Sequence, residues 1–189
     1  AIIKACDDLI DHPEKFLDQF PVPVFQTGSG TQTNMNVNEV VANRANEILG
    51  GKLGEYKFVH PNDHVNMSQS TNDTFPTATL VGCVLSVEDN LLPSLELLEK
   101  SLGNKAKEFN KIIKVGRTHL QDATPIRLGQ EFSGYASMIS NDIKRVKNAV
   151  KECAKLPIGG TAVGTGINTI EGFDILATGF IAEETGIEF

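Results

Sequence analysis

Apolar side chains recur every three or four residues along two long stretches of the chain, Leu80–Leu102 and Leu128–Cys153. A stripe with this spacing is typical of a long helix that packs against other helices in a bundle. The pattern predicts one helix that begins at Asp73 and a second over Leu128–Cys153. The first should kink at Pro93, because proline removes one backbone hydrogen bond and its ring presses on the carbonyl one turn earlier.

Shorter patterns predict the remaining elements. Apolar positions at helical spacing predict a helix over 38–51, which an asparagine at position 36 or 38 would cap and the glycine pair 50–51 would end. Alternating patterns are scarce, and only 56–59 and 111–116 are candidates for short strands. The sequence therefore predicts a mainly helical protein built on long helices.

One part of the first long helix indicates self-association. Residues 78–87 are apolar on nearly every face, because positions off the stripe, such as Val81, Cys83 and Leu85, are apolar as well. A helix of this kind is buried all round, and a chain of 189 residues has little material with which to surround it. We therefore expect oligomers that form through the long helices.

The composition is that of an ordinary globular protein, with 40% hydrophobic residues, 22% charged residues and a formal net charge of −7. This acidic balance argues against nucleic-acid binding, which usually needs a basic patch. The longest charge-free apolar run, 74–87, is too short to span a bilayer, and no cationic signal segment opens the chain. The three cysteines are far apart and indicate free thiols in a reducing compartment. The chain opens inside a helical pattern without a methionine, so we expect it to be part of a longer one.

Four polar, glycine-rich stretches stand between the helical patterns, at 27–36, 60–72, 117–125 and 159–169. Loops on a rigid scaffold are where chemistry usually lies. The first stretch places hydroxyls, amides and glycines ahead of a helix, where N–H groups suit a carboxylate, although a hydrogen-bonded turn explains it equally well. A dinucleotide fingerprint fits poorly, since Thr33 stands where a third glycine belongs.

The second stretch contains histidines but fits a metal site poorly. His60 and His64 have the spacing of a zinc-binding helix, yet a proline follows the first and no glutamate comes next. Ser70, Thr71 and Asn72 come just before the predicted start of the first long helix, where they form either its cap or a cradle for an anion.

In the third stretch, His119 is the one obvious acid/base candidate, because an imidazole is the side chain suited to proton transfer near neutral pH and Arg117 and Thr118 are its neighbours. A lone histidine is more often structural, and no nucleophile elbow or activated cysteine accompanies it. The fourth stretch lacks the ending of a phosphate loop and by itself indicates close backbone packing or a turn. Together the four stretches suggest one polar pocket for a small anion at the helix ends.

These four stretches resemble the class II fumarases of the fumarase/aspartase superfamily. The similar strings are Gly28–Glu39, His60–Thr77, Gly116–Pro125 with Leu128–Phe132, and Gly159–Thr169. They span almost the whole chain, and strings this long are far more specific than a single short motif. Aspartases share the scaffold but depart at the first loop and carry glutamine at the place of His119.

The resemblance implies an all-α, long-helix bundle of the fumarase/aspartase type with a small mixed N-terminal portion. Residues 1–69 would be part of the N-terminal domain, and 70–189 part of a truncated central helical-bundle domain. The implied activity is the reversible hydration of fumarate to L-malate, without metal or organic cofactor, by a homotetramer whose active sites are shared between subunits. The implied location is the cytoplasm, or the mitochondrial matrix in a eukaryote. The alternatives are a related amine-eliminating lyase such as aspartase, and a non-catalytic helical assembly module.

The resemblance also implies roles for individual residues. The catalytic residues would be His119 and Thr118, and a second dicarboxylate site outside the pocket would consist of His60, Asn62 and Asp63. The substrate would be bound by Ser29, Thr31, Ser70, Thr71, Asn72, Thr118 and His119. The family's catalytic base is a serine on a mobile loop with a Ser-Ser pair, which this sequence lacks. We therefore expect these 189 residues alone to be inactive.

Overall fold

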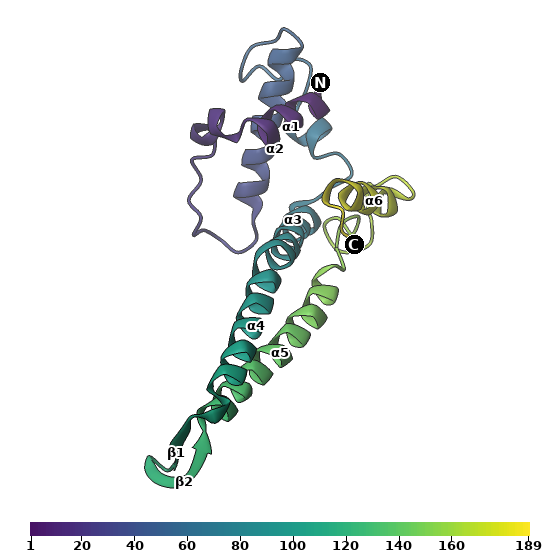
Figure 1. Ribbon diagram of the computed structural model, residues 1–189. Coiled ribbons are helices and arrows are strands. Elements are labelled where there is room, and N and C mark those ends of the chain that lie inside the picture. Colours follow the sequence, from purple (N-terminus) through teal and green to yellow (C-terminus); the bar gives the residue numbers. More distant parts are fainter. The chain divides into compact units, whose positions relative to one another are not determined.

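The computed structural model describes all residues from 1 to 189 and divides the chain into two compact units (Figure 1). The first unit comprises 1–80 and 156–189, and the second comprises 81–155. The predicted domain boundary at 69/70 concerns the complete protein and stays a prediction.

The first unit is built around the packing of α1 (Ile2–Asp11) against α2 (Thr31–Ile48). Its further elements are the 3₁₀ turns η1 (Pro13–Lys15) and η2 (Leu17–Gln19), the π turn η3 (Pro61–Val65), the first part of α3 (Thr71–Ser86), and α6 (Phe173–Thr185). The buried apolar core consists of Ala5, Val41, Ala42, Ala45 and Val59. An ion pair between Arg44 and Asp8, with Nη2 and Oδ2 2.6 Å apart, ties the two helices together at the edge of this core.

The prediction that α2 starts at residue 38 was wrong, because the helix begins at Thr31. Its first turns are rich in Thr and Asn, which are weak helix formers. Here the side chains of Asn34 and Asn38 are buried and donate to the side chain of Asn66 on another segment. These long-range hydrogen bonds stabilise a helical start that local propensity disfavours.

The strand predicted at 56–59 was also wrong, because this segment has no strand partner. Its backbone is satisfied by the buried side chain of Asn46, whose Oδ1 accepts from Phe58 N at 2.9 Å and from Val59 N at 3.3 Å. Asn46 Nδ2 donates in turn to Val59 O at 2.7 Å. One buried amide thus takes the place of a neighbouring strand.

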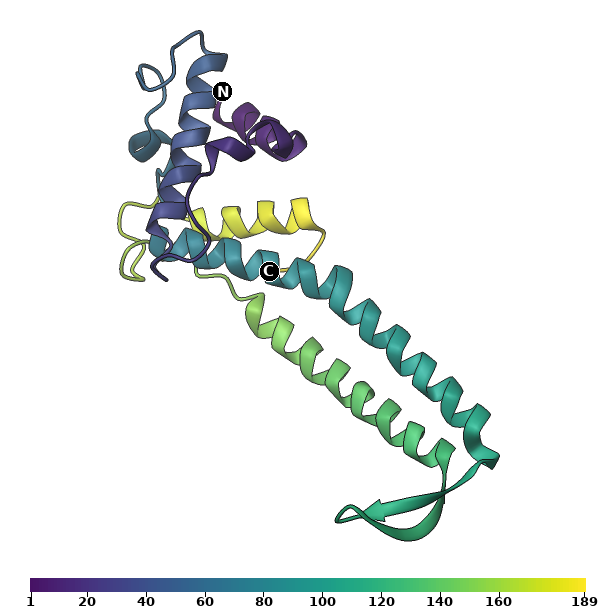
Figure 2. The same cartoon turned by 90° about the vertical axis from the view of Figure 1, so that its left-hand side faces the viewer.

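The second unit is an antiparallel pair of long helices that carries a β-hairpin at one end (Figure 2). It contains the end of α3, the π turn η4 (Val87–Leu91), α4 (Leu92–Glu108), η5 (Phe109–Lys111), β1 (Ile113–Thr118), β2 (Gln121–Arg127) and α5 (Leu128–Cys153). The bounds predicted for α5 are confirmed. The helices α4 and α5 run side by side, and a 3.0 Å ion pair joins Lys147 Nζ to Glu96 Oε1 across them.

The irregularity predicted at Pro93 takes the form of a π turn just before it. The chain remains helical from Thr71 to Glu108, with the wider turn at Val87–Leu91 between α3 and α4. Pro93 is the second residue of α4 and follows the π turn directly, so its missing N–H falls where the regular i→i−4 pattern is already interrupted. The wider turn just before the proline lets one long helical segment continue.

The strand predicted at 111–116 is confirmed as β1, shifted by two residues, but the stretch 117–125 is not a loop. Most of it forms β2, which pairs with β1 in antiparallel register from Ile113 opposite Arg127 to Thr118 opposite Gln121. Its polar composition concealed the strand, because six of its seven residues are exposed. The predictions of a mainly helical fold and of free thiols at all three cysteines are confirmed.

Candidate functional site

The first polar loop lies against the start of α3 within the first unit. Gly30 is the residue before α2 and has a left-handed backbone with φ of +72°. A Cβ atom there would lie 2.2 Å from Cγ of Phe75, so only glycine allows the loop to approach the ring. This contact holds Ser29 and Thr31, both exposed, beside the beginning of α3.

Thr71 is fixed to α2 by a hydrogen bond. Asn34 Nδ2 donates to Thr71 Oγ1 at 2.9 Å and to Asn66 Oδ1 at 3.2 Å. Since the Thr71 hydroxyl accepts in this contact, its own proton is available for another acceptor. The buried amide of Asn34 therefore joins the first and second loops and orients one predicted substrate donor.

Ser70 caps α3, as the structural alternative for this segment predicted. Its Oγ accepts from Asn72 N at 3.2 Å, while Ser70 N donates to Asp73 Oδ1 at 2.9 Å. The two bonds form a variant of the capping box, because Ser70 Oγ accepts from the second helical residue rather than the third, whereas the Asp73 carboxylate at the third position accepts from the N–H of the cap residue. Thr71 and Asn72 are already helical, so a ligand here would meet the positive end of the helix dipole.

Asp73 connects the fourth polar loop to the start of α3, and the sequence reasoning missed it. Its Oδ2 accepts from Gly159 N at 3.2 Å and from Thr161 N at 2.8 Å. Asn72 Nδ2 donates to Ala162 O at 2.8 Å in the same region. The Ser-x-x-Asp capping signature was the signal for Asp73, but nothing local indicated its bonds to a loop 86 residues away.

The fourth loop is irregular, as predicted, and contains several left-handed residues. Thr161 has a φ of +57° and is 5% exposed, and no hydrogen-bond partner reaches its hydroxyl. The hydroxyl of Thr77, one turn after Asp73 on α3, is also buried without a partner. Five predicted substrate residues therefore lie on segments that contact one another in the first unit, namely Ser29, Thr31, Ser70, Thr71 and Asn72.

The residues predicted for a second dicarboxylate site lie on the π turn η3. His60 caps this turn, and its Nδ1 accepts from Asn62 N at 3.3 Å and from Asp63 N at 3.4 Å. His60 N donates to His64 Nδ1 at 2.8 Å. Both imidazoles accept through Nδ1, so in their neutral form the proton of each is on Nε2. The turn thus brings His60, Asn62 and Asp63 together and leaves each Nε2–H free of this network.

Thr118 and His119 belong to the second unit, so the structure does not unite them with the other five residues. Thr118 ends β1, and His119 and Leu120 form the two-residue turn to β2, with φ of +49° and +61°. Positive φ at both positions defines a type I′ turn, which normally favours Asn-Gly. His119 is exposed in a conformation that costs a non-glycine residue about 1–3 kcal/mol, which is typical of functional sites.

Charged side chains hold the base of the hairpin to α5. The ammonium group of Lys114 on β1 pairs with Glu131, whose Oε1 also accepts from the Tyr135 hydroxyl at 2.9 Å. The hydrogen bonds from Lys114 and then Tyr135 lower the pKa of Glu131. The same contact with Glu131 raises the pKa of Tyr135. These pairs fix the hairpin that presents His119.

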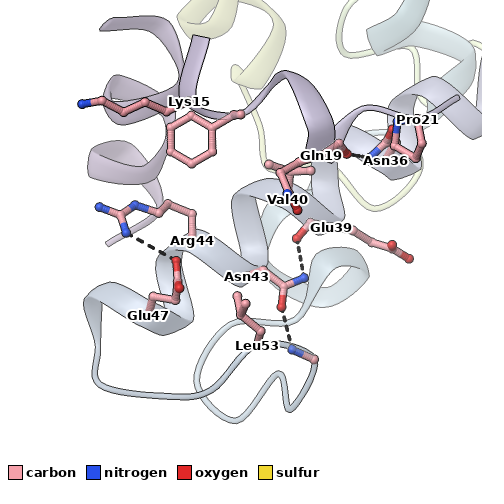
Figure 3. Close-up of a pocket in the computed structure, with 12 residues that line it drawn as sticks. Lys15, Gln19, Pro21, Asn36, Glu39, Val40, Asn43, Arg44, Glu47 and Leu53 are labelled. Carbon is pink, nitrogen blue, oxygen red and sulfur yellow. Dashed lines mark hydrogen bonds and ion pairs between the residues drawn. The ribbon is translucent and has the colours of Figure 1, made fainter. Parts of the chain in front are cut away.

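A pocket of about 660 Å³ in the first unit contains none of the predicted site residues (Figure 3). Its polar side chains already have partners, because Arg44 pairs with Glu47 and Asn43 Oδ1 accepts from the backbone N–H of Gly54. It is lined by Lys15, Phe16, Gln19, Pro21, Asn36, Glu39, Val40, Asn43, Arg44, Glu47, Leu53 and Gly54. No three His, Cys, Asp or Glu side chains cluster as metal ligands, and no helix is long and apolar enough to cross a membrane.

Comparisons with known proteins place the chain among lyases. A family model described as lyase matches residues 1–188. The chain is 56% identical over its full length to the mitochondrial fumarate hydratase of Schizosaccharomyces pombe, and covers 36% of that protein. It is 55% identical to the class II fumarate hydratase of Mesorhizobium japonicum, again over its full length, and covers 40% of it.

Solved structures give the same result. The class II fumarase of Schistosoma mansoni superposes on 98% of the chain with a TM-score of 0.91 and 44% identity, and 38% of that structure is covered. A fumarate lyase:delta crystallin protein from Brucella melitensis matches all of the chain with a TM-score of 0.90 and 45% identity, and 40% of it is covered. The chain thus spans about two fifths of the length of these relatives.

Proposed function

The chain belongs to the lyase family, and on that premise we propose that it is the central part of a fumarate hydratase, which hydrates fumarate reversibly to L-malate. The observation that carries the proposal is the meeting of the first, second and fourth polar loops at the start of α3. Hydroxyl, amide and N–H donors gather there without a basic side chain among them. Such a set suits a small carboxylate that must be held and released.

The chemistry follows from these donors. Removal of a proton next to a carboxylate forms an aci-carboxylate dianion, and preorganised donors stabilise that charge as it develops. Ser29, Thr31, Ser70, Thr71 and Asn72 supply the donors, together with the positive end of α3. His119, assisted by Thr118, moves a proton to or from the water that enters or leaves at the neighbouring carbon. The carbon base, a serine in the family, comes from outside these residues.

The position of His119 in its own unit supports a site shared between copies. The hairpin stands at one end of the α4–α5 pair, and both links to the first unit, at 80/81 and 155/156, stand at the other end. The 26 residues of α5 span roughly 39 Å at 1.5 Å per residue. We therefore assign His119 to the donor set of another copy in a homotetramer, which is formed through the long helices.

The second dicarboxylate site is assigned to η3, where Nε2–H of His60 and the amide of Asn62 serve as donors. Asp63 lies beside them, with Oδ2 3.4 Å from His60 Nδ1. The enzyme is placed in the cytoplasm, or in the mitochondrial matrix if the source is a eukaryote.

The proposal is tested on the complete polypeptide that contains this chain, here called the parent enzyme. Purified parent enzyme should convert malate to fumarate, which is followed by the ultraviolet absorbance of fumarate. Substitution His119→Gln should lower kcat by about 10²–10⁴-fold, the usual contribution of a general acid or base. The matched control is His12→Gln, an exposed histidine remote in sequence from every predicted site residue, which should leave turnover unchanged.

Two results would overturn the proposal. A parent enzyme that releases ammonia from aspartate, and leaves malate unchanged, would establish the aspartase alternative. A parent protein that neither turns over malate nor gains thermal stability from fumarate would establish the non-catalytic assembly module. The 189-residue chain on its own should show no turnover, because it lacks the serine base.

A further inference from the structure

Asp73 is the only ionisable side chain among the buried residues, with 1% of its surface exposed, and it has no cationic partner. A buried carboxylate without a counter-charge is costly unless hydrogen bonds compensate it. Three backbone N–H groups donate to this one, and the single hydroxyl proton of Thr74 is shared between it and Gln69 Oε1, which lies 3.0 Å from Thr74 Oγ1. The N-terminal end of α3 adds a favourable dipole. The free-energy cost of burying this carboxylate points to a role for Asp73 beyond that of an ordinary cap.

The two carboxylate oxygens of Asp73 accept hydrogen bonds from two different segments. Oδ1 accepts from the N–H of the cap residue Ser70 at 2.9 Å and lies 3.2 Å from Thr74 Oγ1 in the first turn of its own helix. Those contacts complete the helix cap. Oδ2 is not needed for a cap, and it accepts instead from Gly159 N at 3.2 Å and Thr161 N at 2.8 Å. One rigid carboxylate therefore sets the position of the fourth loop relative to the start of α3.

Two of the proposed substrate donors depend on that position. Ser70 is oriented by its N–H bond to Asp73, and the amide of Asn72 is oriented by its 2.8 Å bond to Ala162 O in the fourth loop. Asp73 is too deeply buried to touch a substrate. We propose that Asp73 is a positioning residue, which aligns Ser70 and Asn72 by holding Gly159 and Thr161 against α3. This inference rests on the proposed function, because it concerns the same donors.

The test is Asp73→Asn in the parent enzyme, with Asp174→Asn as matched control. Asp174 is also an aspartate in the first turn of a helix and its Cβ lies beside Gly159, but it is exposed and its carboxylate makes no hydrogen bond, so this control removes a charge near the same loop without removing a hydrogen bond. In Asp73→Asn one carboxylate oxygen becomes an NH₂ group that faces N–H donors. A donor misplaced by about 1 Å costs on the order of 10²-fold in rate, so kcat should fall by about that factor. KM for malate should rise about tenfold, while the control leaves both unchanged.

The rise in KM separates positioning from a merely structural role. Loss of folded enzyme lowers the apparent kcat and leaves KM as it was, and that result for Asp73→Asn would overturn the inference. Hydrogen exchange gives a second readout that needs no turnover. The amides of residues 159–161 should exchange faster in the variant, whereas those of α2 and α5 keep their rates.

A measurement on the wild-type protein keeps the inference testable if the variant does not fold. The amides of Gly159 and Thr161 should exchange much more slowly than those of Gly164 and Thr165, which have no acceptor. Equal exchange rates at these four amides would refute the proposal that Asp73 fixes the position of the fourth loop. Absence of fumarate hydration by the wild-type parent enzyme would refute the proposed function instead, and the exchange rates would still decide whether Asp73 holds the loop.

Discussion

Replacement of Gly30 by alanine tests the contact on which the first loop depends. The added Cβ would lie 2.2 Å from Cγ and 2.3 Å from Cδ1 of Phe75, well inside any contact distance. Rotation of the ring about its own axis cannot relieve the clash, because Cγ lies on that axis. The backbone adds strain of its own, since φ at Gly30 is +72°.

The magnitude follows from these two terms. A left-handed backbone costs a residue with a Cβ roughly 1–2 kcal/mol. Overpacking at a buried contact costs typically about 1–3 kcal/mol. Gly30→Ala should therefore lower the free energy of unfolding by about 2–5 kcal/mol. A glycine two residues earlier supplies the control, because a Cβ at Gly28 would meet nothing within 4 Å and its φ is not positive. Gly28→Ala should be neutral or stabilise by about 0.4–1 kcal/mol.

Urea unfolding followed by circular dichroism measures both variants. The double variant Gly30→Ala with Phe75→Ala should lose less stability than the sum of the two single losses, because alanine removes Cγ, Cδ1 and Cδ2, the three atoms nearest the new Cβ. The coupling in this double-mutant cycle should exceed about 0.5 kcal/mol. Equal stability of Gly30→Ala and Gly28→Ala would refute the packing of the first loop against α3, and with it the placement of Ser29 and Thr31.

Three further predictions concern charge, helix docking and assembly. The hydrogen bond from Lys114 keeps the pKa of Glu131 below its unfolded value of about 4.3. The ionised group therefore stabilises the fold above that pH, and the stabilisation is lost as the pH falls through the lowered pKa. In urea titrations at several pH values, Glu131→Gln should reduce the loss of stability that the wild type shows at acid pH. Asp8→Asn breaks the pair with Arg44 and should lower the stability of the first unit by about 1 kcal/mol at low salt, and an effect that persists in high salt would contradict an ionic cause. Cys83 is exposed in the single chain, so its alkylation, measured by mass spectrometry, should be fast in a monomer and slow in the proposed tetramer.

Much of the fold could be predicted because a long amphipathic helix is specified by the spacing of apolar residues within its own sequence. The stripe of α5 predicted both of its ends, since an apolar residue recurs at every third or fourth position over about seven turns. The apolar pattern before Leu102 likewise indicated one long helical segment, although the π turn at Val87–Leu91 was not visible in it. The helix α6 was missed, because its apolar residues are not confined to one face.

The candidate site was predicted less completely, because its organisation rests on contacts between distant residues. Polar loops ahead of helices identified Ser29, Thr31 and Ser70 as candidates, and resemblance to fumarases supplied their roles. Local pattern said nothing of Asp73 Oδ2, whose partners lie 86 and 88 residues further on. The early start of α2 was missed for the same reason, since buried amides of Asn34 and Asn38 bind another segment.

The sequence by itself determined that this protein is mainly helical, which stretches are long helices, and which polar residues stand at their ends. Helical periodicity and capping depend on interactions between residues within one or two turns of each other. They can therefore be recognised in the sequence without knowledge of the tertiary structure. Only the tertiary structure decided that Thr31–Asn36 is helical, that 121–127 is a strand, and that one buried carboxylate joins α3 to the fourth loop. Those outcomes depend on hydrogen-bond partners that the chain brings together only when it folds.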